Sequence, residues 1–329
     1  MNRESIEKKV LGCLLGGLIG DAMGAPVENW HYERIVSEKG YINDFKGSGT
    51  DDSAIKLILC DALIKNNGYV TADEFAASFL RHNYYYDLFF IPVRNMFHKI
   101  QDELELPVHA GYGNMPSSSS AMAISPMGII NACDPRMAAA EAYEVAGLIH
   151  SGSSSFCRDG ASAIAAAVAE AFDPSATVES VLNAAVAYLH PQSAGIMREC
   201  IGKTLALARE KKDYIVFRKA YYEDMKLYNT ICDSRETVPV ALALFYLAHG
   251  DSTRTIEYGT NFGRDADTIG TMAGAIAGAF TGIDSFNKEW VKKVLSGGSD
   301  QGKLANQMTD LIIKRYNDKK SVLKKIETV

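Results

Sequence analysis

Apolar residues recur at three- and four-residue spacing along most of the chain, which is the spacing of one face of an α-helix. The alternating apolar and polar positions typical of a half-buried strand are scarce. The Ala-rich stretches 161–172 and 238–249 combine the helical spacing with strong helix formers. The pattern therefore predicts an all-α protein. We expect helices near residues 5–20, 53–65, 72–82, 87–103, 136–149, 159–172, 177–189, 194–210, 214–224, 236–249, 252–261, 268–281, 287–295 and 300–315.

The breakers between these segments are short, as in Asn66-Asn67-Gly68 and Asp173-Pro174. No shift in composition marks a domain boundary, and no solenoid repeat is present. We therefore expect one compact single-domain helical bundle over residues 1–329.

Two predicted helices carry glycine at every fourth position, which places the glycines on one helix face. These are Gly12, Gly16, Gly20 and Gly24 in the first helix and Gly270, Gly274, Gly278 and Gly282 in the second. Each glycine costs roughly 1 kcal/mol of helix propensity relative to alanine, and close backbone approach is the usual compensation. We predict that the two helices pack against each other, which would bring Asp21 and Glu28 close to Asp265.

The composition is that of an ordinary globular protein, with 329 residues, 47% hydrophobic residues and a net charge of -6. The acidic balance argues against broad nucleic-acid binding, which needs a basic surface. Six cysteines without CxxC pairs are typical of reduced, buried thiols. These features indicate a cytoplasmic protein.

A membrane span needs an apolar run of about 20 residues, and we identify none. Residues 10–20 (VLGCLLGGLIG), ahead of Asp21, have the outline of a signal peptide. Glu4, Glu7 and the repeated glycines argue against that interpretation, so no membrane association is expected.

The most informative chemistry lies in two acidic clusters, Thr50-Asp51-Asp52-Ser53 and Asp265-Ala266-Asp267-Thr268, each at the start of an apolar helix. Helix capping explains either cluster alone, because Thr and Asp satisfy free N–H groups there. Adjacent carboxylates repel one another unless a cation compensates them. Oxygen-only ligands favour a hard cation such as Mg²⁺, and neither cluster continues into an EF-hand loop. Together the clusters would suit two divalent ions.

Several motifs occur in an order that resembles a known family. They are GCLLGGLIGDAMGAPVE at 12–28, TDDS at 50–53, Gly113-Asn114 before SPMG at 125–128, His150-Ser151-Gly152 before an Ala-rich helix, GRDADT at 263–268 and GAIAGA at 274–279. Together, over about residues 8–283, they resemble the ADP-ribosylglycohydrolase family, which includes the dinitrogenase reductase-activating glycohydrolase.

The resemblance implies an all-α fold with a binuclear Mg²⁺ site, Mn²⁺ being the alternative ion. It implies hydrolysis of the glycosidic bond between ADP-ribose and an acceptor, which is a protein side chain or a small conjugate. The implied metal ligands are Thr50, Asp51, Asp52, Asp265, Asp267 and Thr268. The implied catalytic residues are Asp52 or Asp267, to accept a proton from water, and Glu28, to contact metal or substrate.

Two Gly- and Ser-rich loops hold the expected substrate contacts, which are Gly113, Asn114, His150, Ser151, Gly152 and Ser153. Such loops can present N–H and hydroxyl donors to a pyrophosphate. Composition alone favours flexible surface linkers, and it is the position of the loops in the family pattern that indicates ligand contact. Residues 115–120 are longer and richer in serine than the family pattern, and His150-Ser151-Gly152 departs from its Thr-His form. These departures leave the acceptor open.

Two other functions compete with this hypothesis. One is a catalytically silent ADP-ribose-binding or structural protein, since the family includes a crystallin relative. The other is a different two-metal hydrolase, such as a phosphoesterase. The sequence also leaves the oligomeric state open.

Overall fold

The computed structural model describes residues 2–227, 230–296 and 300–329 and confirms the predicted all-α, single-domain fold class. Among these residues the only β-type pairings are two isolated bridges. The α-helices are α1 Arg3–Gly24, α2 Tyr32–Lys39, α3 Asp51–Lys65, α4 Ala72–Arg81, α5 Ile91–Gln101, α6 Pro107–Ala110, α7 Ser125–Ile130, α8 Pro135–Ala146, α9 Phe156–Ala171, α10 Val178–Ala187, α11 Gly195–Lys211, α12 Tyr214–Asp224, α13 Ser234–Leu247, α14 Ser252–Phe262, α15 Ala266–Thr281, α16 Lys288–Ser296 and α17 Gln301–Ile326. Short 3₁₀ turns span Ala25–Val27, Asn83–Leu88, Gly152–Ser154 and Ile283–Ser285.

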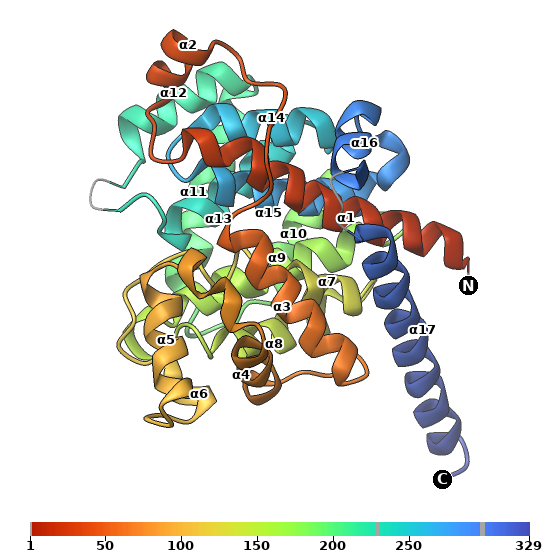
Figure 1. Cartoon of the computed structure of the whole chain (residues 1–329). Helices are drawn as coiled ribbons and strands as arrows, with labels where there is room; N and C mark the ends of the chain where they lie inside the picture. Colours follow the sequence, from red (N-terminus) through yellow and green to blue (C-terminus); the bar gives the residue numbers. More distant parts are fainter. Residues whose placement is uncertain (1, 228–229, 297–299) are drawn as a thin grey trace.

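Helices α1 and α15 lie side by side at the centre of the molecule (Figure 1). A Cβ added to Gly16 would lie only 2.1 Å from the Gly274 carbonyl oxygen, and one on Gly20 would lie 2.1 Å from the Gly270 carbonyl oxygen. The two glycine stripes therefore face each other and run antiparallel, which confirms the predicted packing. Because the helices are antiparallel, the end of α1 meets the start of α15.

The end of α1 also holds the start of α3. Asp21, which is fully buried, accepts hydrogen bonds from the Thr50 N–H at 2.9 Å and from the Ser53 N–H at 3.0 Å. Both predicted acidic clusters are thus fixed to the same end of one buried helix.

Helix α1 corrects one expectation from the sequence. It is long and apolar enough to cross a membrane, yet 78% of its most apolar window is buried inside the protein. Most of its apolar side chains belong to the core, so its composition reflects packing.

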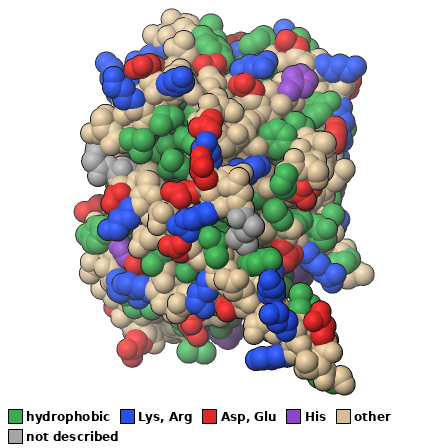
Figure 2. All heavy atoms as spheres, turned by 90° about the vertical axis from the view of Figure 1, so that its right-hand side faces the viewer, with side chains coloured by type: hydrophobic (Ala, Val, Ile, Leu, Met, Phe, Trp, Pro, Cys, Tyr) green, Lys and Arg blue, Asp and Glu red, His purple; other side chains and the backbone are tan. Residues whose placement is uncertain are grey.

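The core is built around the Ala-rich helices α9, α13 and α15. Their small side chains allow these helices to pack closely together. The second half of α17 projects beyond this body (Figure 1), and Lys and Arg side chains gather on the projecting end (Figure 2).

The predicted helices are all present, but three of them differ markedly in their bounds. The helix expected over 300–315 continues to Ile326, and the helix expected over 5–20 continues to Gly24. The helix expected over 87–103 begins only at Ile91, because Pro92 suits a first turn and residues Asn83–Leu88 form a 3₁₀ turn instead. Helices α2, α6 and α7 were not expected. They have eight, four and six residues, and α7 is buried on all sides, so each offers too few positions for a periodic pattern to stand out.

Candidate metal centre and active-site cleft

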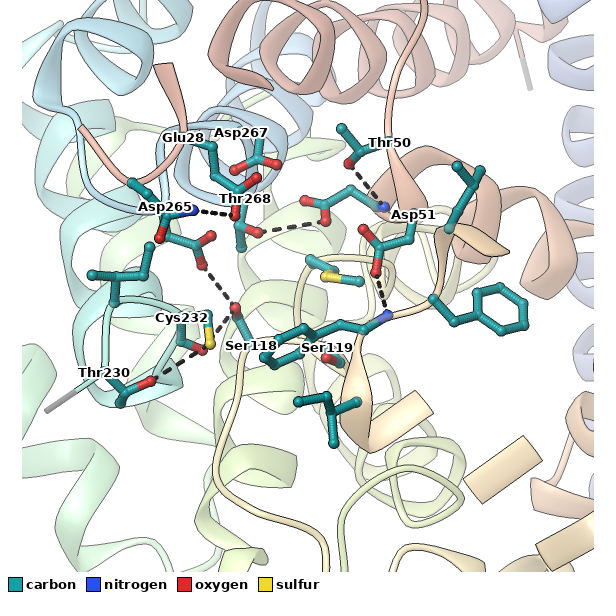
Figure 3. Close-up of a pocket in the computed structure, with 18 of the residues that line it drawn as sticks. Glu28, Thr50, Asp51, Ser118, Ser119, Thr230, Cys232, Asp265, Asp267 and Thr268 are labelled. Atoms are coloured by element: carbon teal, nitrogen blue, oxygen red, sulfur yellow. Dashed lines mark hydrogen bonds between the residues drawn. The ribbon is translucent and has the colours of Figure 1, made fainter. Parts of the chain in front are cut away.

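A cleft of about 650 Å³ opens where the starts of α3 and α15 meet. Its walls come from the Glu28 turn, the segment 88–94, the serine-rich segment 118–122 and residues 230–232 (Figure 3). The polar groups at its base are carboxylates and hydroxyls, and aliphatic and aromatic side chains form much of its rim.

The first acidic cluster occupies the first turn of α3. Thr50 caps the helix, its side chain accepting from the Asp52 N–H. The Asp51 carboxylate accepts from the Phe90 N–H at 3.2 Å, which ties the segment before α5 to the cluster. Asp52 is buried and points toward α15.

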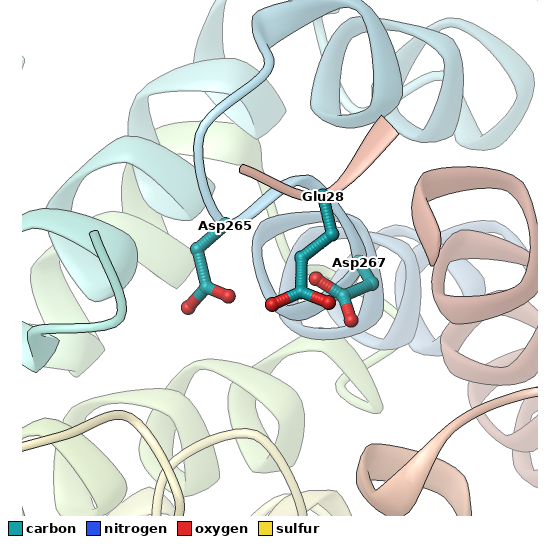
Figure 4. A group of neighbouring side chains, drawn as sticks. All are labelled: Glu28, Asp265 and Asp267. Atoms are coloured by element: carbon teal, nitrogen blue, oxygen red, sulfur yellow. The ribbon is translucent and has the colours of Figure 1, made fainter. Parts of the chain in front are cut away.

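The second cluster joins Glu28 to the first turn of α15. One carboxylate oxygen from each of Glu28, Asp265 and Asp267 lies within 4.8 Å of the others (Figure 4). Asp265 holds the N-cap position, but its side chain caps no N–H group. It accepts instead from the Ser118 hydroxyl at 3.0 Å, so capping does not explain this carboxylate.

A direct contact joins the two clusters. The Thr268 hydroxyl donates to Asp52 Oδ1 at 3.4 Å, across 216 residues of sequence. The two acidic motifs therefore lie in direct contact, and the Glu28 turn lies beside Asp265, as the glycine stripes predicted.

Burial and mutual repulsion raise the pKa values of these carboxyl groups. Desolvation is the largest cause at each one, and it raises the pKa of Asp51 to about 6 and that of Asp265 to about 8. The pKa values of Asp52 and Asp267 lie well above the usual range, since each also faces other carboxylates. Glu28 is more exposed, and burial raises its pKa as well.

The site fits divalent cations by two observations. Asp52 Oδ2 and Asp267 Oδ1 are buried and have no hydrogen-bond partner among the described residues, so each has a lone pair to give. Within the described chain no Lys or Arg forms an ion pair with Asp51, Asp52, Asp265 or Asp267. A purely oxygen donor set without a Lys or Arg ion-pair partner is what Mg²⁺ or Mn²⁺ prefers.

Comparison with known proteins gives the family. The family model for ADP-ribosylglycohydrolase matches residues 2–320. The chain belongs to the ADP-ribosylglycohydrolase family. That its domain extends over all of residues 1–329 stays a prediction.

Relatives of this ADP-ribosylglycohydrolase family member include the uncharacterized protein YegU of Escherichia coli K12. It is 30% identical over an alignment of 306 residues that covers 85% of this chain and 90% of YegU. The human ADP-ribosylhydrolase ARH3 is 40% identical over an alignment of 65 residues that covers 17% of this chain and 18% of ARH3. A solved structure named ADP-ribosylglycohydrolase-related protein complex superposes on this chain with a TM-score of 0.71. The superposition covers 94% of this chain and 99% of the other chain, at 19% sequence identity. The two proteins therefore share the same fold.

The two loops predicted to touch substrate lie next to each other, joined by a bridge between Tyr112 and Ser151. The buried Asn114 amide donates to the carbonyls of Pro92 and Ile149, and the Ser151 hydroxyl donates to the Gly147 carbonyl. His150 is fully buried.

None of the predicted contacts is among the described residues that line the cleft, so a direct role in binding stays a prediction for them. They are Gly113, Asn114, His150, Ser151, Gly152 and Ser153.

Other residues that were not among the predicted site residues also line the cleft. Ser118, whose hydroxyl donates to Asp265, and Ser119 form the serine-rich wall. Phe89, Phe90 and Arg94 line the side near α5. The serine run was visible as an unusual segment, but only its position in the fold shows which hydroxyls reach the cleft.

Arg264, the residue before Asp265, supports the loop that carries the second cluster. Its backbone has φ +59° and pairs with Trp30, beside Glu28. Its guanidinium forms an ion pair with Glu236, which is fully buried, and donates to the Leu227 carbonyl at 2.6 Å. It also donates to the Thr230 carbonyl at 3.2 Å, so one side chain joins the acidic loop, α13 and the cleft wall.

Proposed function

We propose that this protein is a divalent-metal-dependent hydrolase that cleaves the glycosidic bond between ADP-ribose and an acceptor. The supporting observation is the meeting of two buried acidic clusters, with unpartnered carboxylate oxygens, at the base of a cleft large enough for part of a nucleotide sugar. Family membership and the partial similarity to ADP-ribosylhydrolase ARH3 favour this substrate class.

The residues proposed to hold two Mg²⁺ ions, or Mn²⁺, are Thr50, Asp51, Asp52, Asp265, Asp267 and Thr268. When bound, such ions supply charge compensation, orientation of hydroxyl groups and activation of water.

The chain's own residues have distinct proposed roles in this reaction. Asp52 or Asp267 takes a proton from water, since each keeps a buried oxygen free of protein donors. Glu28 lies at the mouth of the site, more exposed than either Asp265 or Asp267, where it can contact substrate.

A single assay tests the proposal. The purified protein is incubated with Mg²⁺ and with arginine-linked, serine-linked and nucleotide-linked ADP-ribose, and the products are separated by chromatography. We expect intact ADP-ribose from at least one substrate and none after chelation. Cleavage within the pyrophosphate would instead indicate a phosphoesterase.

Tight ADP-ribose binding without release from any conjugate would identify the protein as a silent family member. The cytoplasmic location and the lack of nucleic-acid or membrane partners remain part of the proposal, to be checked by fractionating cells that express the chain.

A further inference from the structure

The serine-rich segment connects the cleft to His150 through a chain of hydrogen bonds. The Ser120 hydroxyl lies 2.8 Å from His150 Nδ1, and His150 Nε2 lies 3.0 Å from the Ser117 hydroxyl. The Ser117 hydroxyl donates to the Ser119 hydroxyl at 2.9 Å, and Ser119 lines the cleft. Three serines and one histidine therefore form a continuous path from the core to the ligand cavity.

Every member of this chain is buried, with at most 3% exposure. Burial lowers the pKa of His150 to about 3, with partial opposition from Asp233 and from the Met115 carbonyl. The imidazole is therefore neutral near pH 7, with one nitrogen donating and the other accepting.

The direction of the bond between Ser117 and Ser119 indicates which nitrogen of His150 carries the proton. Because the Ser117 hydroxyl donates to Ser119, its oxygen is left to accept from Nε2–H of His150. Nδ1 of the neutral ring then accepts from the Ser120 hydroxyl.

The Ser117 oxygen also accepts from the Ser119 N–H at 3.2 Å, which leaves its own proton for the Ser119 oxygen. The proton of Ser119 then has no acceptor among the described residues and is free for the cleft.

We propose that Ser119 is a ligand-binding residue of the cleft, and that His150 is a positioning residue that directs the Ser119 proton toward the ligand through Ser117. A hydroxyl held as a donor selects an oxygen that only accepts hydrogen bonds, such as a phosphate oxygen. This inference rests on the proposed function for the identity of the ligand, ADP-ribose, and assigns its pyrophosphate to the Ser119 wall.

The test compares Ser119→Ala and Ser117→Ala with Ser162→Ala. Ser162 is equally buried but donates to the Ala139 carbonyl, outside the chain of bonds, so it controls for the loss of a buried hydroxyl. ADP-ribose affinity is measured by calorimetry with Mg²⁺ present. We expect Ser119→Ala to weaken binding about ten- to a hundredfold, as for a lost hydrogen bond to a charged group, and to raise KM more than it lowers kcat.

Ser117→Ala removes no ligand contact. A smaller loss of ADP-ribose affinity, about three- to tenfold, would therefore show that the orientation of the Ser119 hydroxyl contributes to binding. Nitrogen-15 NMR of His150 in the unmodified protein provides a second readout, and we expect the Nε2–H tautomer. Binding by both variants equal to that of Ser162→Ala, or an Nδ1–H tautomer, would overturn the inference. If the unmodified protein itself binds no ADP-ribose, the proposed function fails, and the tautomer still decides the direction of the hydrogen-bond chain.

Discussion

The Thr268 hydroxyl donates to Asp52 Oδ1, so the first turns of α15 and α3 touch although 216 residues separate them. This contact exists only in the folded chain. Cations that bind both turns would therefore stabilise the folded state by mass action, by about 2.7 kcal/mol at a ligand concentration one hundred times Kd. We expect Mg²⁺ to raise the melting temperature, and an unchanged value would argue against a shared metal site.

The raised carboxyl pKa values predict how stability depends on pH. The pKa values of Asp51 and Asp265 are about 6 and 8 in the folded protein, above the usual 3.8. The folded state therefore binds more protons than the unfolded state, and stability falls as pH rises from about 4 to about 8. Thermal melts in a chelator should show this fall, and Mg²⁺ should restore stability most at pH 8. A metal-free protein that gains stability over this range contradicts the assignment.

Replacing a buried carboxylate should separate stability from activity. In metal-free protein at pH 8, Asp267→Asn removes repulsion from Asp265 and Glu28, so we expect a gain of about 1 kcal/mol in unfolding free energy. The same change should abolish turnover and the stabilisation by Mg²⁺, and Asp52→Asn should behave alike. The control is Asp310→Asn, an exposed partner of Arg3, which should change stability by less than about 0.5 kcal/mol and leave turnover intact. Calorimetric melts and the release assay measure both effects.

The contact between α1 and α15 should not tolerate a single added methyl group. Gly16→Ala places Cβ 2.1 Å from the Gly274 carbonyl oxygen, a backbone atom that cannot turn aside. We expect the free energy of unfolding, measured with denaturant, to fall by about 3 kcal/mol or more, and Gly16→Leu should prevent folding. Gly202→Ala, in the middle of α11 with no atom within 4 Å of the new Cβ, should instead gain about 0.5–1 kcal/mol. Similar effects at the two sites would refute the packing argument.

The buried ion pair beside Asp265 should be costly to break. Arg264→Ala leaves Glu236 buried without its charge partner, so we expect the free energy of unfolding to fall by about 3–5 kcal/mol. We also expect weaker Mg²⁺ binding, because the Asp265 loop loses its support. The matched exposed pair is Lys203–Glu199, where Lys203→Ala should cost less than about 0.5 kcal/mol. Urea unfolding measures the change in stability, and metal titration measures the change in Mg²⁺ affinity. If Arg264→Ala changes both only slightly, the Asp265 loop does not depend on this ion pair.

Much of the fold could be predicted from the sequence, because its signals are periodic or local. The three- and four-residue spacing fixed the helices, and the four-residue glycine spacing identified the partners α1 and α15. The short helices α2, α6 and α7 were missed, since a segment of one or two turns gives too few positions for a periodic pattern.

The candidate site divides in the same way. From the sequence by itself the glycine spacing predicted that Asp21 and Glu28 lie near Asp265, because spacing along a helix is a local property. The joining of the two acid-rich turns into one site was implied by the resemblance to the family. Only the tertiary structure decided that Asp21 holds Thr50, that the Phe90 N–H meets Asp51, and that His150 reaches the cleft through serines. Those contacts join segments that repeat no pattern, and their hydrogen bonds form wherever packing brings a donor to an acceptor.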